Sequence, residues 1–156
     1  MTEYSTSVDQ VVNPGESVVF DQSPVPCGRG FVRHRDGSGN FLLSGWLPRR
    51  SGCQCGRNRS AQYLVAFGGN IAVNTGGTVG EITMNLSLDG STLPDSLMAV
   101  TPAAVEEYFN VGTSNIVEVW NGCCETISVR NTSDQPILVR AGAHIGFARP
   151  DLNVTY

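Results

Sequence analysis

The sequence predicts an all-β protein, an antiparallel β-sandwich of the jelly-roll kind, and three observations support this fold class. Apolar segments of about four to seven residues recur along the chain, with Gly, Asn or Pro between them, as in proteins of many short strands. Residues 81–89 alternate cleanly between polar and apolar side chains. The run DGSGN at 36–40 separates two apolar segments, which is a strong β-hairpin signal.

Local signals justify each predicted strand in chain order. ESVVFD (16–21) is the first, and Pro24 and Pro26 in the next segment predict that regular pairing is interrupted there. Residues 47–60 have the composition of a loop. PAAVEEYF (102–109) fits a strand, a single turn or a helix that begins at Thr101. The other predicted strands are FVRHR, FLLSGW, YLVAFGGNIAV, GEITMNLSLDG, SLMAVT, NIVEVW, ETISVRN, PILVR and AHIGFAR.

RSAQYLVAFGGNIAV (59–73) carries the longest regular pattern. One alternate set, which includes Tyr63, Val65, Phe67 and Ile71, is apolar and is predicted to fill the core. The other set is smaller and milder but carries no charge. A strand with one face in water should have charged or strongly polar residues on that face. The second face of this strand is therefore predicted to contact protein as well.

Length and composition indicate one globular domain. The chain has 156 residues, of which 40% are hydrophobic and 15% charged. We expect an N-terminal arm at 1–12 and a single domain at 13–156 with a basic loop at 47–60. No apolar run is long enough to span a bilayer, and MTEYSTSVDQ lacks the basic start and apolar stretch of a secretory signal. We therefore expect no membrane partner and no signal-peptide export.

Charge is divided unevenly along the chain. All ten basic residues are arginine, and seven of them lie between residues 29 and 59, opposed over 28–60 only by Asp36, which gives +6. From residue 61 onward, three arginines and nine carboxylates give −6. This division predicts that Arg49, Arg50, Arg57 and Arg59 dock on an acidic partner or neighbouring copy, with a solvated loop as the alternative. We expect no nucleic-acid partner, because the net charge is −4 and the aromatic residues are not interleaved with the arginines.

Metal binding is not favoured. The five cysteines (Cys27, Cys53, Cys55, Cys123 and Cys124) could with His34 and His144 supply zinc ligands. Their spacing is not C-x2-C, and adjacent residues on a strand point to opposite faces. We expect inert or partly paired thiols, with Cys123 facing the core, and no metal or other cofactor.

No set of residues predicts catalysis. His34 is expected to point outward with its basic neighbours, and His144 to lie on the face opposite Ile145. Glu106 and Glu107 are adjacent in sequence, but most such pairs are solvated surface. The chain has no G-x-S-x-G, P-loop or H-E-x-x-H motif to supply a nucleophile with its base. The sequence therefore predicts a protein that is not an enzyme and has no catalytic residues.

A family resemblance covers residues 13 to 149 or so. The stretches that carry it are NPGESVVF, CGRGFVRHRDGSG, YLVAFGGNIAVNTGGTVGEITMNLSLDGSTLP, VTPAAVEEYFNVGTSNIVEV and GCCETISVRNTSDQPILV. They resemble small proteins encoded in bacteriophages and prophages of gut bacteria, and more distantly the C-terminal domain of the collagen-like glycoprotein on bacillus spore coats. This resemblance implies a complement- or tumour-necrosis-factor-like jelly roll that assembles as a trimer. The segment LPRRSGCQCGRNRS departs from it by being longer and more basic.

The trimer implied by the resemblance explains the uncharged second face of 59–73. Gln62, Leu64, Ala66 and Asn70 would meet their copies across the three-fold axis, with Gln62 and Asn70 hydrogen-bonded between copies. The alternative is a monomeric sandwich whose second face is covered by residues 22–60. Ser87, on the polar side of the next predicted strand, is expected to face solvent.

The resemblance implies a virion structural protein, most simply a capsid decoration protein that is assembled in the host cytoplasm and binds the major capsid or another virion protein. The alternatives are a receptor- or carbohydrate-binding tip that takes a host-surface glycan, and a stand-alone host or spore-surface protein. Exposed aromatic residues clustered on loops would favour the carbohydrate-binding tip. Trp46 and Trp120 are the two tryptophans available for such a cluster.

Overall fold

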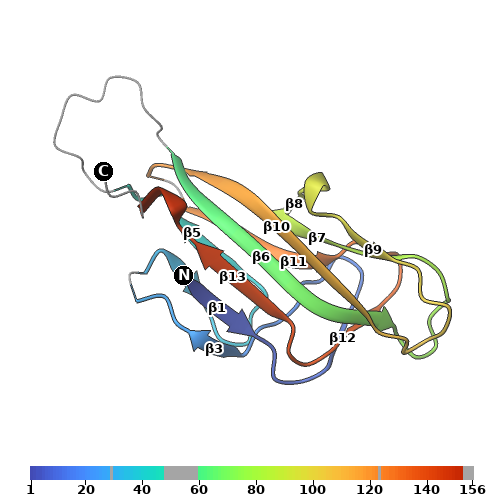
Figure 1. The fold of residues 1–156 in the computed structure, drawn as a ribbon. Helices are drawn as coiled ribbons and strands as arrows, with labels where there is room; N and C mark the ends of the chain where they lie inside the picture. The colour runs from blue at the N-terminus through green and yellow to red at the C-terminus, as the bar shows by residue number, and fades with distance from the viewer. Residues whose placement is uncertain (29, 48–59, 123, 153–156) are drawn as a thin grey trace.

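Two antiparallel β-sheets face each other in the protein, and Figure 1 shows the long strands of both running along the molecule. The computed structural model describes residues 1–28, 30–47, 60–122 and 124–152. This architecture confirms the predicted all-β jelly roll. Outside the strands, the described residues contain two short 3-10 helices, η1 (Pro94–Ser96) and η2 (Pro150–Leu152). None of the helices in this part of the chain is long and apolar enough to cross a membrane.

The first sheet, called sheet A, is built around β6. This strand pairs with β10 on one side and with both β12 and β13 on the other. Beyond β12 lies β2, and beyond β13 lie β1 and then β3. The strands of sheet A are β1 (Thr2–Ser5), β2 (Gln10–Val12), β3 (Gln22–Val25), β6 (Ser60–Val73), β10 (Phe109–Trp120), β12 (Ile137–Val139) and β13 (His144–Ala148).

The second sheet, called sheet B, runs in the order β4-β5-β11-β7, with β8 and β9 both paired to β7. Its strands are β4 (Val32–His34), β5 (Phe41–Ser44), β7 (Ile82–Leu88), β8 (Ser91–Thr92), β9 (Met98–Val100) and β11 (Cys124–Asn131). Residues 102–108, which the sequence left open between helix, strand and turn, contain only turns and bends before β10 begins. The hairpin predicted around 36–40 is confirmed, because Val32 pairs with Leu43 and His34 with Phe41.

The core lies between the sheets and follows the alternation read from the sequence. Tyr63, Val65, Phe67 and Ile71 of β6 are all buried, which confirms the predicted inward face of this strand. Opposite them, sheet B contributes a matching set of fully buried side chains from β5, β7 and β11: Phe41, Leu43, Ile82, Met84, Leu86, Ile127 and Val129. Burying large apolar side chains from both sheets is what stabilises a sandwich of this size.

The first twelve residues are part of sheet A and do not extend away from it. Thr2 pairs with Phe147 and Ser5 with His144, so that β1 continues the sheet next to β13. Residues 10–12 pair with 137–139 of β12. Tyr4 is buried and its ring packs 4.9 Å from that of Phe41. The N-terminal segment therefore contributes both backbone pairing and core contacts.

Two expectations about the segment before the hairpin are wrong. Residues 16–21 form isolated bridges, at Ser17 and Phe20, where a continuous strand was predicted. Conversely, Pro24 lies within β3, where pairing was expected to be interrupted. Proline is tolerated there because β3 is an edge strand, and its pairing with β1 is irregular between residues 3 and 5.

Two side chains are buried although the sequence predicted that they face solvent. His34 points inward beside Val32, because alternate residues of a strand share a face, and its ring stacks 4.4 Å from Phe41. Ser87 is buried with 1% of its surface exposed, although the alternation placed it in solvent. Along the edge of β7, the segment after β8 continues the pairing, and Leu93 donates a backbone hydrogen bond to Leu86 at 2.9 Å.

Candidate functional site

The outward side of sheet A is the first candidate site, and its centre is the reverse of β6. Leu64 and Ala66 are exposed there, and Gln62 and Asn70 are half-buried. The two neighbouring strands add residues in register with these, most of them small or uncharged. The residues of this surface, called the β6 face, are Gln62, Leu64, Ala66, Gly68 and Asn70 of β6, Asn110, Gly112, Ser114, Ile116 and Glu118 of β10, and His144, Gly146 and Ala148 of β13.

An exposed apolar pair lies within the β6 face. Ile116 of β10 is directly opposite Leu64, and the two side chains are 65% and 39% exposed. On the other side of Leu64 lies Ala148 of β13. Sequence reasoning found Leu64 but missed Ile116, whose signal was an isoleucine in the outward phase of NIVEVW. These exposed aliphatic side chains adjoin across the sheet and form an apolar patch on its outer side.

Polar groups at the two ends of the β6 face are paired within the chain. Gln62 donates from Nε2 to Oε1 of Glu118 at 3.1 Å. Asn110 donates from Nδ2 to Oδ1 of Asn70 at 3.4 Å. Gln62 and Asn70 were predicted to bond between copies, and each keeps further donors or acceptors for that purpose. The charge on this face is confined to its margins, which leaves the centre uncharged.

The glycines of β6 make room for β13. A Cβ atom on Gly68 would come within 2.9 Å of Cε1 of His144, so the imidazole lies against the bare backbone. A Cβ atom on Gly69 would come equally close, at 2.9 Å, to that of Ala143 on the core side. The Gly-Gly step therefore lets the two strands approach on both faces. His144 is exposed on the β6 face, as its position in the alternation predicted.

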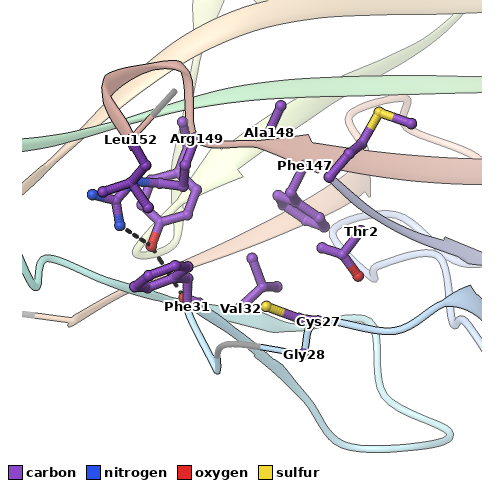
Figure 2. A pocket seen from close by; sticks show the side chains of 11 residues that line it. Thr2, Cys27, Gly28, Phe31, Val32, Phe147, Ala148, Arg149 and Leu152 are labelled. Atoms are coloured by element: carbon purple, nitrogen blue, oxygen red, sulfur yellow. Dashed lines mark hydrogen bonds between the residues drawn. The ribbon is translucent and has the colours of Figure 1, made fainter. Parts of the chain in front are cut away.

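A second candidate is a pocket at one end of the sandwich, with a volume of about 320 Å³. Figure 2 shows that Phe147, Val32, Thr2 and Cys27 line one part of it and Phe31 and Arg149 another. Polar and apolar groups contribute to this lining about equally. The charged group is Arg149, which is 7% exposed and therefore nearly desolvated.

Arg149 uses its guanidinium to hold the end of the sandwich together. Nε and Nη2 donate to the two carboxylate oxygens of Asp151 at 2.9 and 2.7 Å. Nη2 also donates to the carbonyl oxygen of Trp46 at 3.2 Å, and Nη1 donates to the hydroxyl of Tyr63 at 3.3 Å. The described contacts thus occupy four of the roughly five donors of an arginine. This set ties η2 to β6 and to the segment after β5.

The pKa values of Tyr63 and Arg149 are both raised at this end of the sandwich. Burial raises the pKa of the Tyr63 hydroxyl above its usual value, and the hydrogen bond from Arg149 only partly opposes this effect. For Arg149, burial acts against the charge, but the hydrogen bonds to Asp151 and Tyr63 outweigh it and raise its pKa. Tyr63 therefore stays protonated and Arg149 charged at any ordinary pH. The arrangement is suited to structural support, since neither group is free to exchange a proton.

The remaining predicted site residues fall partly outside the described residues. Arg49, Arg50, Arg57 and Arg59 lie there, as do Cys53, Cys55 and Cys123. Of the other cysteines, Cys27 is half-buried and Cys124 exposed. Within the described part of the chain, no group of three His, Cys, Asp or Glu residues is arranged to hold a metal ion.

Comparison with known proteins identifies the fold. No protein-family model matches the chain, and no curated protein sequence matches it. Among solved structures, it resembles the Eiger TNF of S. frugiperda with a TM-score of 0.65 and 11% identity, covering 95% of this chain and 90% of that one. The globular domain of zebrafish complement 1qA gives a TM-score of 0.61 at 8% identity, covering 96% and 95%. Murine APRIL gives 0.61 at 13%, covering 95% and 98%.

These similarities define the class of fold. They extend over nearly the whole of both chains, so the complete sandwich and not a single sheet is shared. The chain therefore has the tumour-necrosis-factor- and complement-like jelly-roll fold that the sequence resemblance implied. At these identities the likeness concerns the fold alone.

Proposed function

We propose that the chain is a non-enzymatic structural protein that assembles as a homotrimer through the β6 face. The observation that carries this proposal is the uncharged centre of that face, where Leu64 and Ile116 are exposed side by side. Three-fold closure would bury this surface against itself and leave no open edge for further growth. The likeness to the tumour-necrosis-factor and complement folds supports the same arrangement.

The trimer would serve as a component of a bacteriophage particle, as a capsid decoration protein bound to the major capsid or another virion protein. Support for this role comes from the sequence resemblance to small phage and prophage proteins. Docking on the particle would use the basic loop through Arg49, Arg50, Arg57 and Arg59. The alternative role is a receptor- or carbohydrate-binding tip of a tail or head fibre. Antibody labelling of purified particles separates the two roles, because decoration predicts label over the head and a tip predicts label at the end of a fibre.

The trimer itself is tested by placing a charge in the β6 face. Leu64→Asp would bring three carboxylates together where water is largely excluded, and this should cost several kcal/mol per trimer. Multi-angle light scattering should therefore give a trimer for the wild type and a folded monomer for the variant.

Leu97→Asp is the matched control, since Leu97 is 58% exposed and lies between η1 and β9, outside the residues of the β6 face. This variant should remain trimeric. A monomeric wild type, or a Leu64→Asp protein that stays trimeric, would refute assembly through the β6 face.

A further inference from the structure

A shallow groove runs along β4 on the outer side of sheet B. Because Val32 and His34 point into the core, Arg33 and Arg35 between and beyond them point outward. Two hollows adjoin at Arg33. The first, of about 520 Å³, is lined by Gly30, Phe31, Arg33, Ser44 and Trp46. The second, of about 290 Å³, is lined by Arg33, His34, Arg35, Ser38, Asn40, Leu42 and Thr126. Together they are called the β4 groove.

Trp46 forms an exposed aromatic surface at one end of the β4 groove. Its side chain is 53% exposed, although the ring stacks on Phe31 with 5.8 Å between centroids and 24° between planes. Phe31 is supported in turn by the guanidinium of Arg149, 4.9 Å from its ring, and that guanidinium lies 4.8 Å from the ring of Tyr63. Trp46 is therefore held in one orientation by a continuous stack that reaches into the core.

The backbone of Trp46 is fixed as well. Its N–H donates to Oγ of Ser44 at 3.2 Å, and its carbonyl oxygen accepts from Arg149 at 3.2 Å. An aromatic ring that is already oriented loses little conformational freedom when something stacks on it. The Ser44 hydroxyl, which accepts the bond from Trp46, keeps its own proton to donate into the groove.

Positive charge in the groove is not neutralised by the protein. The described residues that line the two hollows include no carboxylate. The guanidinium groups of Arg33 and Arg35 make no hydrogen bond or ion pair with any residue in the described ranges. A planar guanidinium recognises a carboxylate with two parallel hydrogen bonds. Arg33 is the better placed of the two, because it borders both hollows.

We propose that the β4 groove binds an oligosaccharide that carries carboxylate groups. One pyranose ring would stack on Trp46, since the C–H groups on a sugar face carry slight positive charge and meet the negative face of the indole. The carboxylate of a neighbouring sugar would pair with Arg33. Hydroxyl and amide groups of Ser38, Ser44, Asn40 and Thr126 line the remainder of the groove and would contact sugar hydroxyls.

The shape of the groove favours a sugar over an acidic peptide. It is shallow and open, and its lining combines the stacked rings of Trp46 and Phe31 with guanidinium, hydroxyl and amide groups, without a deep hollow for a side-chain anchor. The site lies on sheet B, whereas assembly is proposed through sheet A. Binding in the β4 groove does not depend on the trimer, and the two proposals can fail separately.

Isothermal titration with tetragalacturonic acid tests the site directly. We expect saturable binding to the wild type that weakens as salt is raised, because a carboxylate–arginine pair is partly screened. Fully methyl-esterified tetragalacturonate is the matched ligand, since it keeps the sugar rings and loses the charges, and it should bind at least about tenfold more weakly.

Variants identify the residues involved. Arg33→Gln and Trp46→Ala should each weaken binding of tetragalacturonic acid at least about tenfold. Arg33→Gln should leave the melting temperature unchanged, since the Arg33 side chain makes no hydrogen bond or ion pair with the described residues, and so it separates binding from folding. Arg140→Gln is the control, because Arg140 lies beyond β12 with its guanidinium 5.3 Å from the Tyr108 ring.

Three outcomes would overturn the proposal: no binding at millimolar ligand, binding that both groove variants retain, or equal binding of the methyl ester. Equal binding of a tetraglutamate peptide would also overturn it, because this result would show recognition of charge without the sugar. Light scattering on the same samples reports the oligomeric state independently.

Discussion

Glu125 on β11 has a carboxylate oxygen, Oε2, that is buried and has no hydrogen-bond partner among the described residues. Burial, and to a smaller extent the nearby charge of Asp89, raises the pKa of this carboxyl above its usual value. A carboxyl whose pKa is higher in the folded chain favours folding when it is protonated. Its contribution is fully present below the unfolded-state pKa and is lost as pH rises through the folded-state pKa.

Glu125→Gln should therefore stabilise the protein at neutral pH. We expect the melting temperature at pH 7 to rise by roughly 1–3 °C, with a smaller change at pH 4, where the wild-type carboxyl is already largely protonated. Calorimetry at the two pH values measures this difference. Glu81→Gln, at an exposed glutamate, is the control and should change neither value. An equal effect of Glu125→Gln at both pH values would contradict the assignment.

At the scale of the element, β1 is an integral strand. Its four residues pair with β13, and Tyr4 packs its ring against those of His34, Phe41 and Phe147. Removing residues 1–6 should take away this pairing together with a buried aromatic side chain, whose loss alone costs about 3–5 kcal/mol. Denaturant unfolding should show a strongly destabilised or unfolded chain.

The matched comparison for this truncation is Val8→Ala, a change in the same N-terminal segment at a side chain that is 62% exposed. That variant should unfold at the wild-type denaturant concentration. A truncated protein as stable as the wild type would show that residues 1–6 act as a dispensable arm.

Particular elements show how far the sequence could predict the structure. The inward face of β6 and the hairpin at 36–40 followed from alternation and turn chemistry, which are local properties. The same alternation rule could have placed His34 on the inward face, because His34 shares a face with Val32. Its basic neighbours suggested instead that it faces solvent. The burial of Ser87 could not be predicted, because the alternation within one strand does not show which segments cover its outer face. The β4 groove depends on long-range contacts of Arg149 in the same way, and no local pattern contains these.

At the scale of the whole molecule, assembly through an apolar face has its own signature. Folding and association are linked in a trimer, so the melting temperature of the wild type should rise with protein concentration. The centre of the β6 face is uncharged, so this dependence should persist as salt is raised, because there is little charge to screen. Thermal melts over a hundredfold range of concentration at low and high salt measure it. The melting temperature of Leu64→Asp should be independent of concentration, and a concentration-independent wild type would contradict assembly.

The stack of Trp46, Phe31, Arg149 and Tyr63 has a consequence for how related chains can diverge. Its outer member forms part of the β4 groove, whereas its inner member is a core residue of β6. A substitution at any of these four positions would disturb both ligand contact and the interior, so descendants of this sequence should rarely vary there. The guanidinium groups of Arg33 and Arg35 make no hydrogen bond or ion pair with the described residues. Under the proposed sugar binding, a lineage that took a different oligosaccharide would accordingly show its differences along the outward side of β4, around an unchanged tryptophan.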